Sequence, residues 1–293
     1  MRSKYLIILI LSILLFGCKK NDINNSRKLK IISLAPSITK MIIHLGAVDD
    51  LIGVTDICEF ENRIDALASD GKIYRVSAFN SFNFEKIVSL EPTHIIGVDS
   101  VPMEDKIYFE KLVGKQKLVW LIHPKNFDEI YDQIEKISLL VNKENEGKRI
   151  VENMKNKMKH MRSAVANIDE NLKPKAVVEI YYPPFVTAGK NTFISDILIK
   201  SGARLALNIN ENWPTPSIEE ILTSEPDLIV KTSHQNGDGI DKYFAKDKIK
   251  IFVPKNADIF LQPGVESVSA AYELYDFIRL NFPNAPFPKL KYD

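Results

Sequence analysis

Apolar residues recur every three or four positions over residues 142–168, and this spacing predicts one long amphipathic helix. The apolar stripe consists of Ile150, Val151, Met154, Met158, Met161, Val165 and Ile168. Lysines and arginines fill the other faces, so one side of the helix is expected to face water. We expect Asn142 to cap its start, and Pro174 follows its end, where proline prevents continuation. A helix of roughly 35–40 Å, at about 1.5 Å per residue, suits a strut between two bodies.

The segments on either side of this helix alternate between strand and helix patterns. Before it, the pattern predicts strands at 30–34, 51–55, 94–98 and 117–122, and helices at 37–45, 83–90 and 127–141. After it, the pattern predicts strands at 176–181, 228–232 and 249–253, and helices at 192–200, 217–223 and 265–281. Strands separated by helices predict an α/β fold with parallel sheets and helices on both faces. We therefore expect two Rossmann-like lobes, at 29–141 and 169–293, joined by the helix at 142–168.

The two predicted lobes repeat each other in sequence. FNFEKIVSLEPTHIIGV at 82–98 aligns with PSIEEILTSEPDLIVKT at 216–232, so that Glu85 corresponds to Glu219. A weaker repeat relates SITKMIIHLGA at 37–47 to TFISDILIKSGA at 192–203. Any amphipathic helix followed by Glu-Pro and a buried strand would produce the first similarity. Two similarities in the same order favour a duplicated lobe.

The first residues have the pattern of an export signal. Arg2 and Lys4 precede an uncharged run at 5–16, which is too short to span a bilayer. The junction at its end reads Leu-Phe-Gly-Cys, residues 15–18. This junction resembles the bacterial lipoprotein signal, in which the cysteine is lipidated and becomes the first mature residue. We expect a signal peptide at 1–17, lipidation of Cys18 and a flexible tether at 18–28. The alternative is an ordinary secretory signal with a chance cysteine.

Composition narrows the function classes. The chain has 39 Lys and Arg against 38 Asp and Glu, a net charge of +1 without a basic block in the folded part, which argues against a nucleic-acid partner. With Cys18 lipidated, Cys58 would have no partner for a disulfide. The expected location is the cell envelope, as a membrane-anchored lipoprotein that faces the periplasm or the exterior. About 275 mature residues exceed one comfortable core and favour two domains.

The chain carries none of the common catalytic motifs. It lacks GxGxxG, GxxxxGK[ST], GxSxG and HExxH, and its five histidines show no metal-ligand spacing. We therefore expect no enzyme activity, no metal centre and no resident cofactor.

Aromatic and polar residues gather in the loops near the predicted strand ends. Ligands of parallel sheets sit at the carboxyl ends of the strands, so these loops would form a cleft between the lobes. The residues expected to line it are Phe60, Phe79, Asn80, Tyr182, Phe185 and Trp213. Rigid aromatic walls with a few polar groups suit a large, partly apolar small molecule. The alternative is that Phe79 and Trp213, which occupy equivalent places in the two lobes, are anchors buried in their own lobes.

Several segments together resemble the substrate-binding lipoproteins of ABC importers for cobalamin or ferric-siderophore complexes. They are KIISLAPSITKMIIHLG from residue 30, GVTDICEF from 53, FNFEKIVSLEPTHIIGV from 82, PPFVTAGKNTFISDILIKSGA from 183 and QPGVESVSAAYELYDFI from 262. The resemblance extends over nearly all of 30–283. It implies two lobes joined by one rigid helix, a metal-chelate ligand, a permease dimer as partner and little movement on binding.

The resemblance favours cobalamin or a related corrinoid as the ligand. TDICEF at 55–60 resembles the Thr-x-x-Cys-x-Tyr segment of cobalamin-type members, which implies a ligand contact at Cys58, and Asp258 matches an acidic residue of the cobalamin binder. Asn212-Trp213-Pro214 resembles that binder's tryptophan-proline loop. The chain departs from the pattern at Phe60-Glu61, where an aromatic-proline step is usual, and it lacks a tryptophan near Phe79.

Two alternatives to a corrinoid binder are considered. A ferric siderophore or haem is the first, and haem would require an axial ligand such as Tyr181 or Tyr182. A metallocluster oxidoreductase on a related fold is the second, but such enzymes hold clusters through several cysteines, and only one non-lipidated cysteine is present here.

Glu85 and Glu219 are the expected docking residues. In the family that the chain resembles, one exposed glutamate on each lobe binds arginines of the permease subunits, and motif matching places that role on these two residues. The alternative is that an acid in the first helical turn merely complements the helix dipole, an effect of about 0.3–1 kcal/mol.

Overall fold

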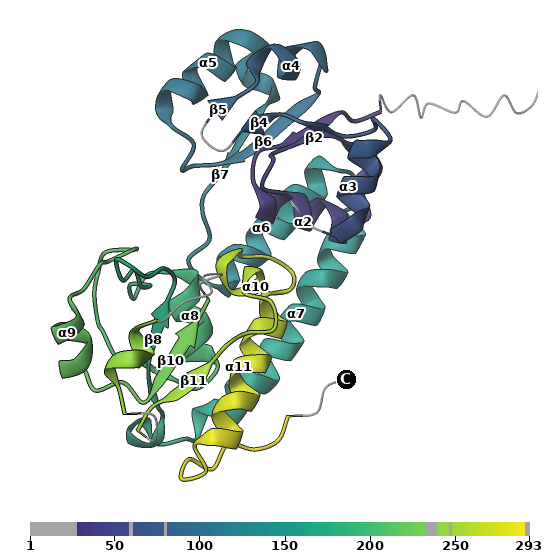
Figure 1. Ribbon diagram of the computed structural model, residues 1–293. Helices are drawn as coiled ribbons and strands as arrows, with labels where there is room; N and C mark the ends of the chain where they lie inside the picture. Colours follow the sequence, from purple (N-terminus) through teal and green to yellow (C-terminus); the bar gives the residue numbers. More distant parts are fainter. Residues whose placement is uncertain (1–27, 59–60, 79–80, 233–238, 246–247, 291–293) are drawn as a thin grey trace, which may run out of the picture.

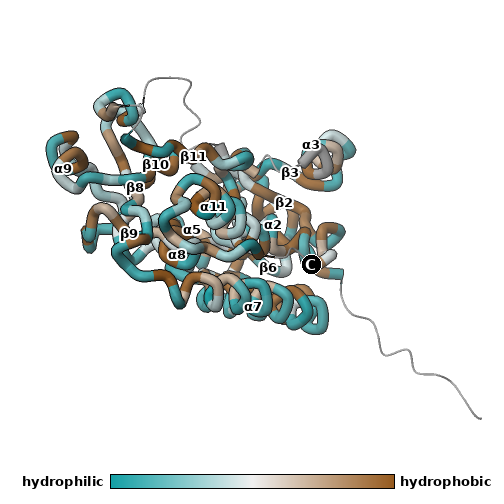
Figure 2. Tube along the Cα trace, turned by 90° about the horizontal axis from the view of Figure 1, so that it is seen from below, coloured by the Kyte–Doolittle hydropathy of each residue, from teal (hydrophilic) through white to brown (hydrophobic). Residues whose placement is uncertain are grey.

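The long helix predicted at 142–168 is α7 (Glu144–Ala166), and its 23 residues give it a length of roughly 35 Å. The computed structural model describes residues 28–58, 61–78, 81–232, 239–245 and 248–290. The apolar stripe of α7 is buried from Ile150 to Val165, and the lysines of the helix are exposed. In Figure 2, α7 lies at one edge of the molecule and its turns there are mainly hydrophilic.

The start of α7 differs from the prediction that Asn142 caps it. The residue before the helix is Lys143, whose side chain forms no capping hydrogen bond. Asn142 instead has a left-handed backbone (φ 54°) and ends the preceding helix, α6 (Phe127–Leu140). The N–H groups of Asn142 and Lys143 donate to the carbonyls of Leu139 and Ser138. Asparagine tolerates this conformation, so the prediction assigned the right residue type to the wrong helix end.

The N-terminal lobe is built on a five-stranded parallel sheet of order β3-β2-β1-β6-β7. Its strands are β1 (Ile31–Ser33), β2 (Leu51–Val54), β3 (Tyr74–Arg75), β6 (His94–Val98) and β7 (Leu118–Leu121). A small antiparallel pair, β4 (Ser77–Ala78) and β5 (Ser81–Phe82), lies beside it. The other helical segments of the lobe are α2 (Pro36–His44), η1 (Val48–Asp50), α3 (Glu61–Ser69), α4 (Phe84–Ser89), α5 (Met103–Val113) and η2 (Lys115–Lys117). Helices α3 and α5 were not predicted.

The C-terminal lobe is built on a four-stranded parallel sheet of order β11-β10-β8-β9. Its strands are β8 (Lys175–Glu179), β9 (Arg204–Leu205), β10 (Leu228–Lys231) and β11 (Lys250–Phe252). Its helical segments are η3 (Glu170–Leu172), α8 (Phe193–Lys200), α9 (Ile218–Thr223), η4 (Ile240–Tyr243), α10 (Asp258–Leu261) and α11 (Ser267–Asn281). The predicted α/β class with two parallel sheets is therefore confirmed.

The two sheets share one strand order. The run β2-β1-β6-β7 corresponds to β9-β8-β10-β11, element for element in chain order. Backbone details repeat as well, because Glu91 and Glu225, which follow equivalent helices, have φ values of 49° and 47°. A non-glycine residue with positive φ is uncommon, so its recurrence at matched positions supports duplication of the lobe.

The carboxyl ends of the two sheets face each other. The chain leaves β7 and crosses to the beginning of α6, where the Phe127 N–H donates to Asp196 on α8 of the other lobe at 3.1 Å (Figure 1). Since the five strands of the N-terminal sheet are parallel, their carboxyl ends share this direction. Helix α7 then runs away from the N-terminal lobe, and β8 returns from its far end. The strand-end loops of both lobes are thus turned toward one another.

Helix α7 joins the two lobes, as predicted, and other helices pack along it. Helices α6 and α7 pack against each other, and α11 lies along the lower part of α7 (Figure 1). Tyr272 on α11 donates its hydroxyl to the Lys157 carbonyl on α7 at 2.9 Å. On the opposite flank, Lys40 on α2 forms an ion pair with Glu266, just before α11, at 3.1 Å. No helix in the described part of the chain combines the length and hydrophobicity needed to cross a membrane.

Candidate ligand-binding site

Eight residues were predicted to bind the ligand, and the structure describes five of them. Phe60, Phe79 and Asn80 lie outside the described residues. The remaining five, Cys58, Tyr182, Phe185, Trp213 and Asp258, are described below.

Cys58 is fully buried in the N-terminal lobe. Its sulfur lies 3.1 Å from the Thr55 hydroxyl and 3.3 Å from the Thr39 hydroxyl, and burial raises the pKa of the thiol. Arg75 donates to the carbonyls of Thr55 and Cys58, both at 2.9 Å. The sulfur is therefore protonated at neutral pH and holds the loop after β2 in shape. A direct contact between Cys58 and a ligand stays a prediction.

The loop after β8 places Tyr182 and Phe185 on opposite sides. Tyr181 and Val186 pair as an isolated bridge that closes the loop, and both peptide bonds from Tyr182 to Pro184 are cis. Phe185 is only 4% exposed and packs in the core of its own lobe. Tyr182 is half-buried, and its hydroxyl reaches outward to the hydroxyl of Tyr243 at 3.0 Å. The loop thus presents Tyr182 and uses Phe185 as its anchor.

Trp213 is 45% exposed, which speaks against the alternative that it is a buried anchor. Its loop is held by backbone hydrogen bonds from Gly189 to Asn212 (3.0 Å) and from Thr187 to Pro214 (3.1 Å). Gly189 is required at this crossing, because a Cβ there would overlap the Glu211 carbonyl oxygen. The ring is therefore displayed by a rigid backbone. Its contact with a ligand stays a prediction.

Asp258 begins α10, in the segment that follows β11, and is half-buried. Its backbone N–H is held by the Asn256 side chain at 2.9 Å. This places it on the facing edge of the C-terminal lobe, because the segment continues from the carboxyl end of β11. A contact between Asp258 and a ligand stays a prediction.

The sequence reasoning missed Lys242 and Tyr243. Both lie in η4, which leads from β10 toward β11, and the Lys242 ammonium is 5.3 Å from the ring centroids of Tyr182 and of Tyr243. The hydrogen bond with Tyr182 raises the pKa of Tyr243. The sequence signal that could have found them was a lysine next to a tyrosine in a polar loop. Its link to Tyr182, 61 residues earlier in the chain, emerges only from the fold.

Glu85 and Glu219 lie in the first turns of α4 and α9, and both are exposed. The caps of these helices come from other residues: Asn83 caps α4, and Ser217 with Glu220 forms a capping box on α9. Within the described part of the chain, neither Glu85 nor Glu219 forms a hydrogen bond or an ion pair. Both carboxylates are thus available to an outside partner.

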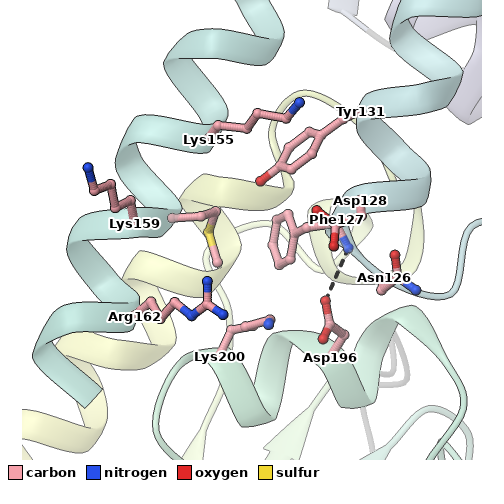
Figure 3. A pocket seen from close by; sticks show the side chains of 10 residues that line it. Asn126, Phe127, Asp128, Tyr131, Lys155, Lys159, Arg162, Asp196 and Lys200 are labelled. Atoms are coloured by element: carbon pink, nitrogen blue, oxygen red, sulfur yellow. Dashed lines mark hydrogen bonds between the residues drawn. The ribbon is translucent and has the colours of Figure 1, made fainter. Parts of the chain in front are cut away.

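A separate hollow of about 250 Å³ lies among α6, α7 and α8 (Figure 3). Its charged lining includes Asp128, Lys155, Lys159, Arg162, Asp196 and Lys200. In Figure 3, Arg162 points across the hollow, whereas Lys159 points away from it. Burial raises the pKa of Asp196, which accepts the Phe127 N–H. This hollow lies on the helical side of the molecule, so it belongs to the joint between the lobes.

The described residues contain no group of three or more His, Cys, Asp or Glu side chains arranged to hold a metal ion. The loops after β8, β9 and β10 offer aromatic surface at Tyr182, Trp213 and Tyr243, together with the ammonium group of Lys242. Such a surface binds by stacking, hydrogen bonding and charge.

A family model described as "Periplasmic binding protein" matches residues 31–250. The chain belongs to the periplasmic binding protein family. Its two parallel sheets with facing carboxyl ends are thus the frame of a known class of binding proteins.

Three proteins show the range of similarity within this family. The "Uncharacterized ABC transporter substrate-binding lipoprotein YvrC" of Bacillus subtilis is 26% identical over 215 residues, which span 73% of this chain and 66% of that protein. The periplasmic vitamin B12-binding protein BtuF of Vibrio cholerae has a similar structure, with a TM-score of 0.70, 21% identity and coverage of 86% and 96% of the two chains. A periplasmic heme-binding protein from Pseudomonas aeruginosa also has a TM-score of 0.70, with 15% identity and coverage of 89% and 95%.

Proposed function

We propose that this protein is the substrate-binding component of an ABC-type importer and that its ligand is cobalamin or a related corrinoid. The observation that carries the proposal is the family match over 31–250, on a chain whose two lobes turn their strand-end loops toward each other. The ligand would lie between these loops. Exposed Trp213 and half-buried Tyr182 would contact its apolar rings, because each ring is held by a rigid backbone and loses little freedom on binding.

Cobalamin is favoured by two features of the chain. The buried Thr55–Cys58 contact stabilises the loop that resembles the cobalamin-type segment, and the Trp213-Pro214 loop is displayed as such a contact requires. The similarity to a vitamin B12-binding protein supports the same choice. These features concern both lobes, so a ligand large enough to touch both is expected.

Haem or a ferric siderophore is the second candidate, and a specific observation favours it. Tyr181 is 44% exposed, and the hydroxyls of Tyr182 and Tyr243 lie side by side at the same edge. Phenolate oxygen is an established ligand of haem iron. The similarity to a heme-binding protein supports this alternative.

Absorption spectroscopy distinguishes the candidates. Purified protein is incubated with cyanocobalamin, haemin or a ferric hydroxamate siderophore, desalted, and its spectrum recorded. We expect retention of cyanocobalamin at about one molecule per protein, with a shift of the corrin bands. Retention of haemin alone, or of the siderophore alone, would identify that compound as the ligand in place of cobalamin. Retention of none of the three would overturn the proposal.

We further propose that Glu85 and Glu219 dock the protein on the permease dimer. The support is that the two exposed carboxylates stand at equivalent positions of a duplicated frame, without a partner in the described part of the chain. A pseudo-symmetric protein that binds across two related permease subunits needs one such contact per lobe. Pairing of carboxylate with arginine is strong and directional, so it would fix the orientation of the bound protein.

We also propose that Cys18 carries the lipid anchor, on the basis of the charged start, the uncharged run and the Leu-Phe-Gly-Cys junction. The variant Cys18→Ala should move the protein from the membrane fraction to the soluble fraction. Mass spectrometry of the wild type should find residue 18 at the amino terminus with an acyl modification. An unmodified terminus elsewhere would contradict this.

A further inference from the structure

Three side chains from two loops meet near the carboxyl ends of β8 and β10. Tyr182 follows β8, and Lys242 and Tyr243 belong to η4 after β10. The two hydroxyls are 3.0 Å apart, and the Lys242 ammonium lies 5.3 Å from each ring centroid. Tyr243 is 45% exposed, so the cluster is open to an incoming molecule.

A buried charge network fixes this cluster in place. Glu179, the last residue of β8, is only 1% exposed and accepts the Ile240 N–H at 2.7 Å. Lys231, the last residue of β10, contacts Asp241 at 2.7 Å and lies 3.9 Å from Glu179. Burying charged groups is costly unless they are paired and hydrogen-bonded. Here the pairing locks η4 onto the carboxyl ends of two strands, one residue before Lys242.

The chemistry of the cluster suits an anionic oxygen. One of the two tyrosine hydroxyls donates to the other, and the second keeps its own hydrogen for an outside acceptor. Lys242 is exposed and has no ion-pair partner among the residues that the structure describes, since neighbouring Asp241 is held by Lys231. The cluster thus offers an O–H donor and an uncompensated ammonium group side by side.

We propose that Tyr182, Lys242 and Tyr243 bind an anionic oxygen of the transported ligand, either a phosphodiester or a carboxylate. The inference rests on the proposed function and adds to it the part of the ligand that the C-terminal lobe recognises. The two sources are distinguishable: cobalamin carries a phosphodiester in its nucleotide loop, cobinamide lacks that loop, and haem carries two carboxylates.

The test is titration calorimetry with cyanocobalamin, dicyanocobinamide and haemin on the wild type, Lys242→Gln and Tyr243→Phe. Lys250→Gln is the matched control, because Lys250 is also an exposed lysine of this lobe but lies at the opposite, amino end of β11. For a phosphodiester, Lys242→Gln weakens cyanocobalamin binding about tenfold and leaves cobinamide binding unchanged. For a carboxylate, the same loss is seen with haemin. Tyr243→Phe gives a smaller loss in the same direction, and Lys250→Gln gives none.

The outcomes separate this inference from the proposed function. If the wild type binds a ligand and Lys242→Gln binds it equally well at unchanged melting temperature, the anionic contact is wrong and the proposed function stands. An equal loss for cyanocobalamin and cobinamide would also overturn the contact, because cobinamide lacks the phosphodiester. If the wild type binds none of the three probes, the proposed function itself fails.

Discussion

The two lobes share one strand order but differ in how the element after the third strand uses its aromatic residue. In the N-terminal lobe, α5 follows the third strand of the repeat, and its Phe109 is fully buried among Phe82, Phe84 and Trp120 at ring distances of 4.9–5.9 Å. In the C-terminal lobe, the short η4 takes this place and brings Tyr243 to the surface. The aromatic residue of this element therefore stabilises the core of the first lobe, whereas in the second lobe it is presented at the surface.

Removing both proposed docking glutamates should have the largest effect on transport. It tests a feature that the two lobes share, an exposed glutamate in the first turn of equivalent helices. We expect Glu85→Ala combined with Glu219→Ala to abolish ligand uptake by cells, and each single variant to reduce it, because each lobe supplies one charge-assisted contact. Ligand affinity in solution should not change. Glu104→Ala, an exposed acid on α5, is the control. Normal uptake by the double variant would leave both residues with the helix-dipole role alone.

The two tryptophans of the chain allow a direct comparison of the lobes. Trp213→Ala should weaken ligand binding at least tenfold, since loss of a central aromatic contact costs ~2 kcal/mol or more, with a melting temperature close to that of the wild type. Trp120→Ala should do the reverse, lowering the melting temperature while affinity per folded molecule holds. Calorimetry and thermal unfolding measure both. Collapse of stability in Trp213→Ala would show that its exposed ring is structural after all.

The joint between the lobes should respond to pH through Asp196. Burial raises the pKa of this carboxyl above its ordinary value of 3.8, so the folded state is favoured when Asp196 is protonated and loses that advantage as pH rises through the folded-state pKa. Asp196→Asn keeps an acceptor for the Phe127 N–H and removes the buried charge. We expect a melting temperature a few degrees above wild type at neutral pH, with the difference shrinking toward about pH 4.

Exposed Asp132 on α6 provides the control for this measurement. Asp132→Asn should leave the melting temperature at neutral pH close to that of the wild type. A constant offset for Asp196→Asn at every pH would mean that its effect comes from packing rather than from charge.

The smallest expected effect concerns the distance between the lobes. Because α6 and α11 pack along the connecting helix α7, and Lys40 pairs with Glu266 across the lobes, closure would have to disturb packed helices. Small-angle scattering profiles with and without cyanocobalamin should nearly coincide. A decrease of several ångströms in the radius of gyration would show that a hinge exists.

The sequence predicted β6 and α6 better than the peripheral helix α5. The strand at 94–98 matches β6 residue for residue, and the helix at 127–141 matches α6 to within one residue. Helix α5 was missed because only Phe109 among its residues is fully buried, while Met103 and Ile107 are exposed and blur the apolar period.

Residues of the candidate site could be predicted from the sequence only where the two lobes repeat each other. Trp213, Glu85 and Glu219 were predicted as contact residues because the two lobes can be aligned, and all three are exposed. Phe185, by contrast, faces the core of its lobe, because the bridge between Tyr181 and Val186 turns the loop back on itself. The backbone hydrogen bonds that close this turn, from Ile180 to Val186 and from Val186 to Tyr181, leave no mark in the pattern of apolar and polar residues.

The hydrophobic interior has a consequence for how the chain folds. One uninterrupted cluster runs from Ile31 and Met41 in the first lobe, through Met154 on α7, to Val178 and Tyr275 in the second. Neither half can close its interior alone, because each would leave an apolar helix face in water. The chain should therefore unfold in a single cooperative transition, with calorimetric and van't Hoff enthalpies in agreement. The two lobes would then be a single cooperative unit in calorimetry.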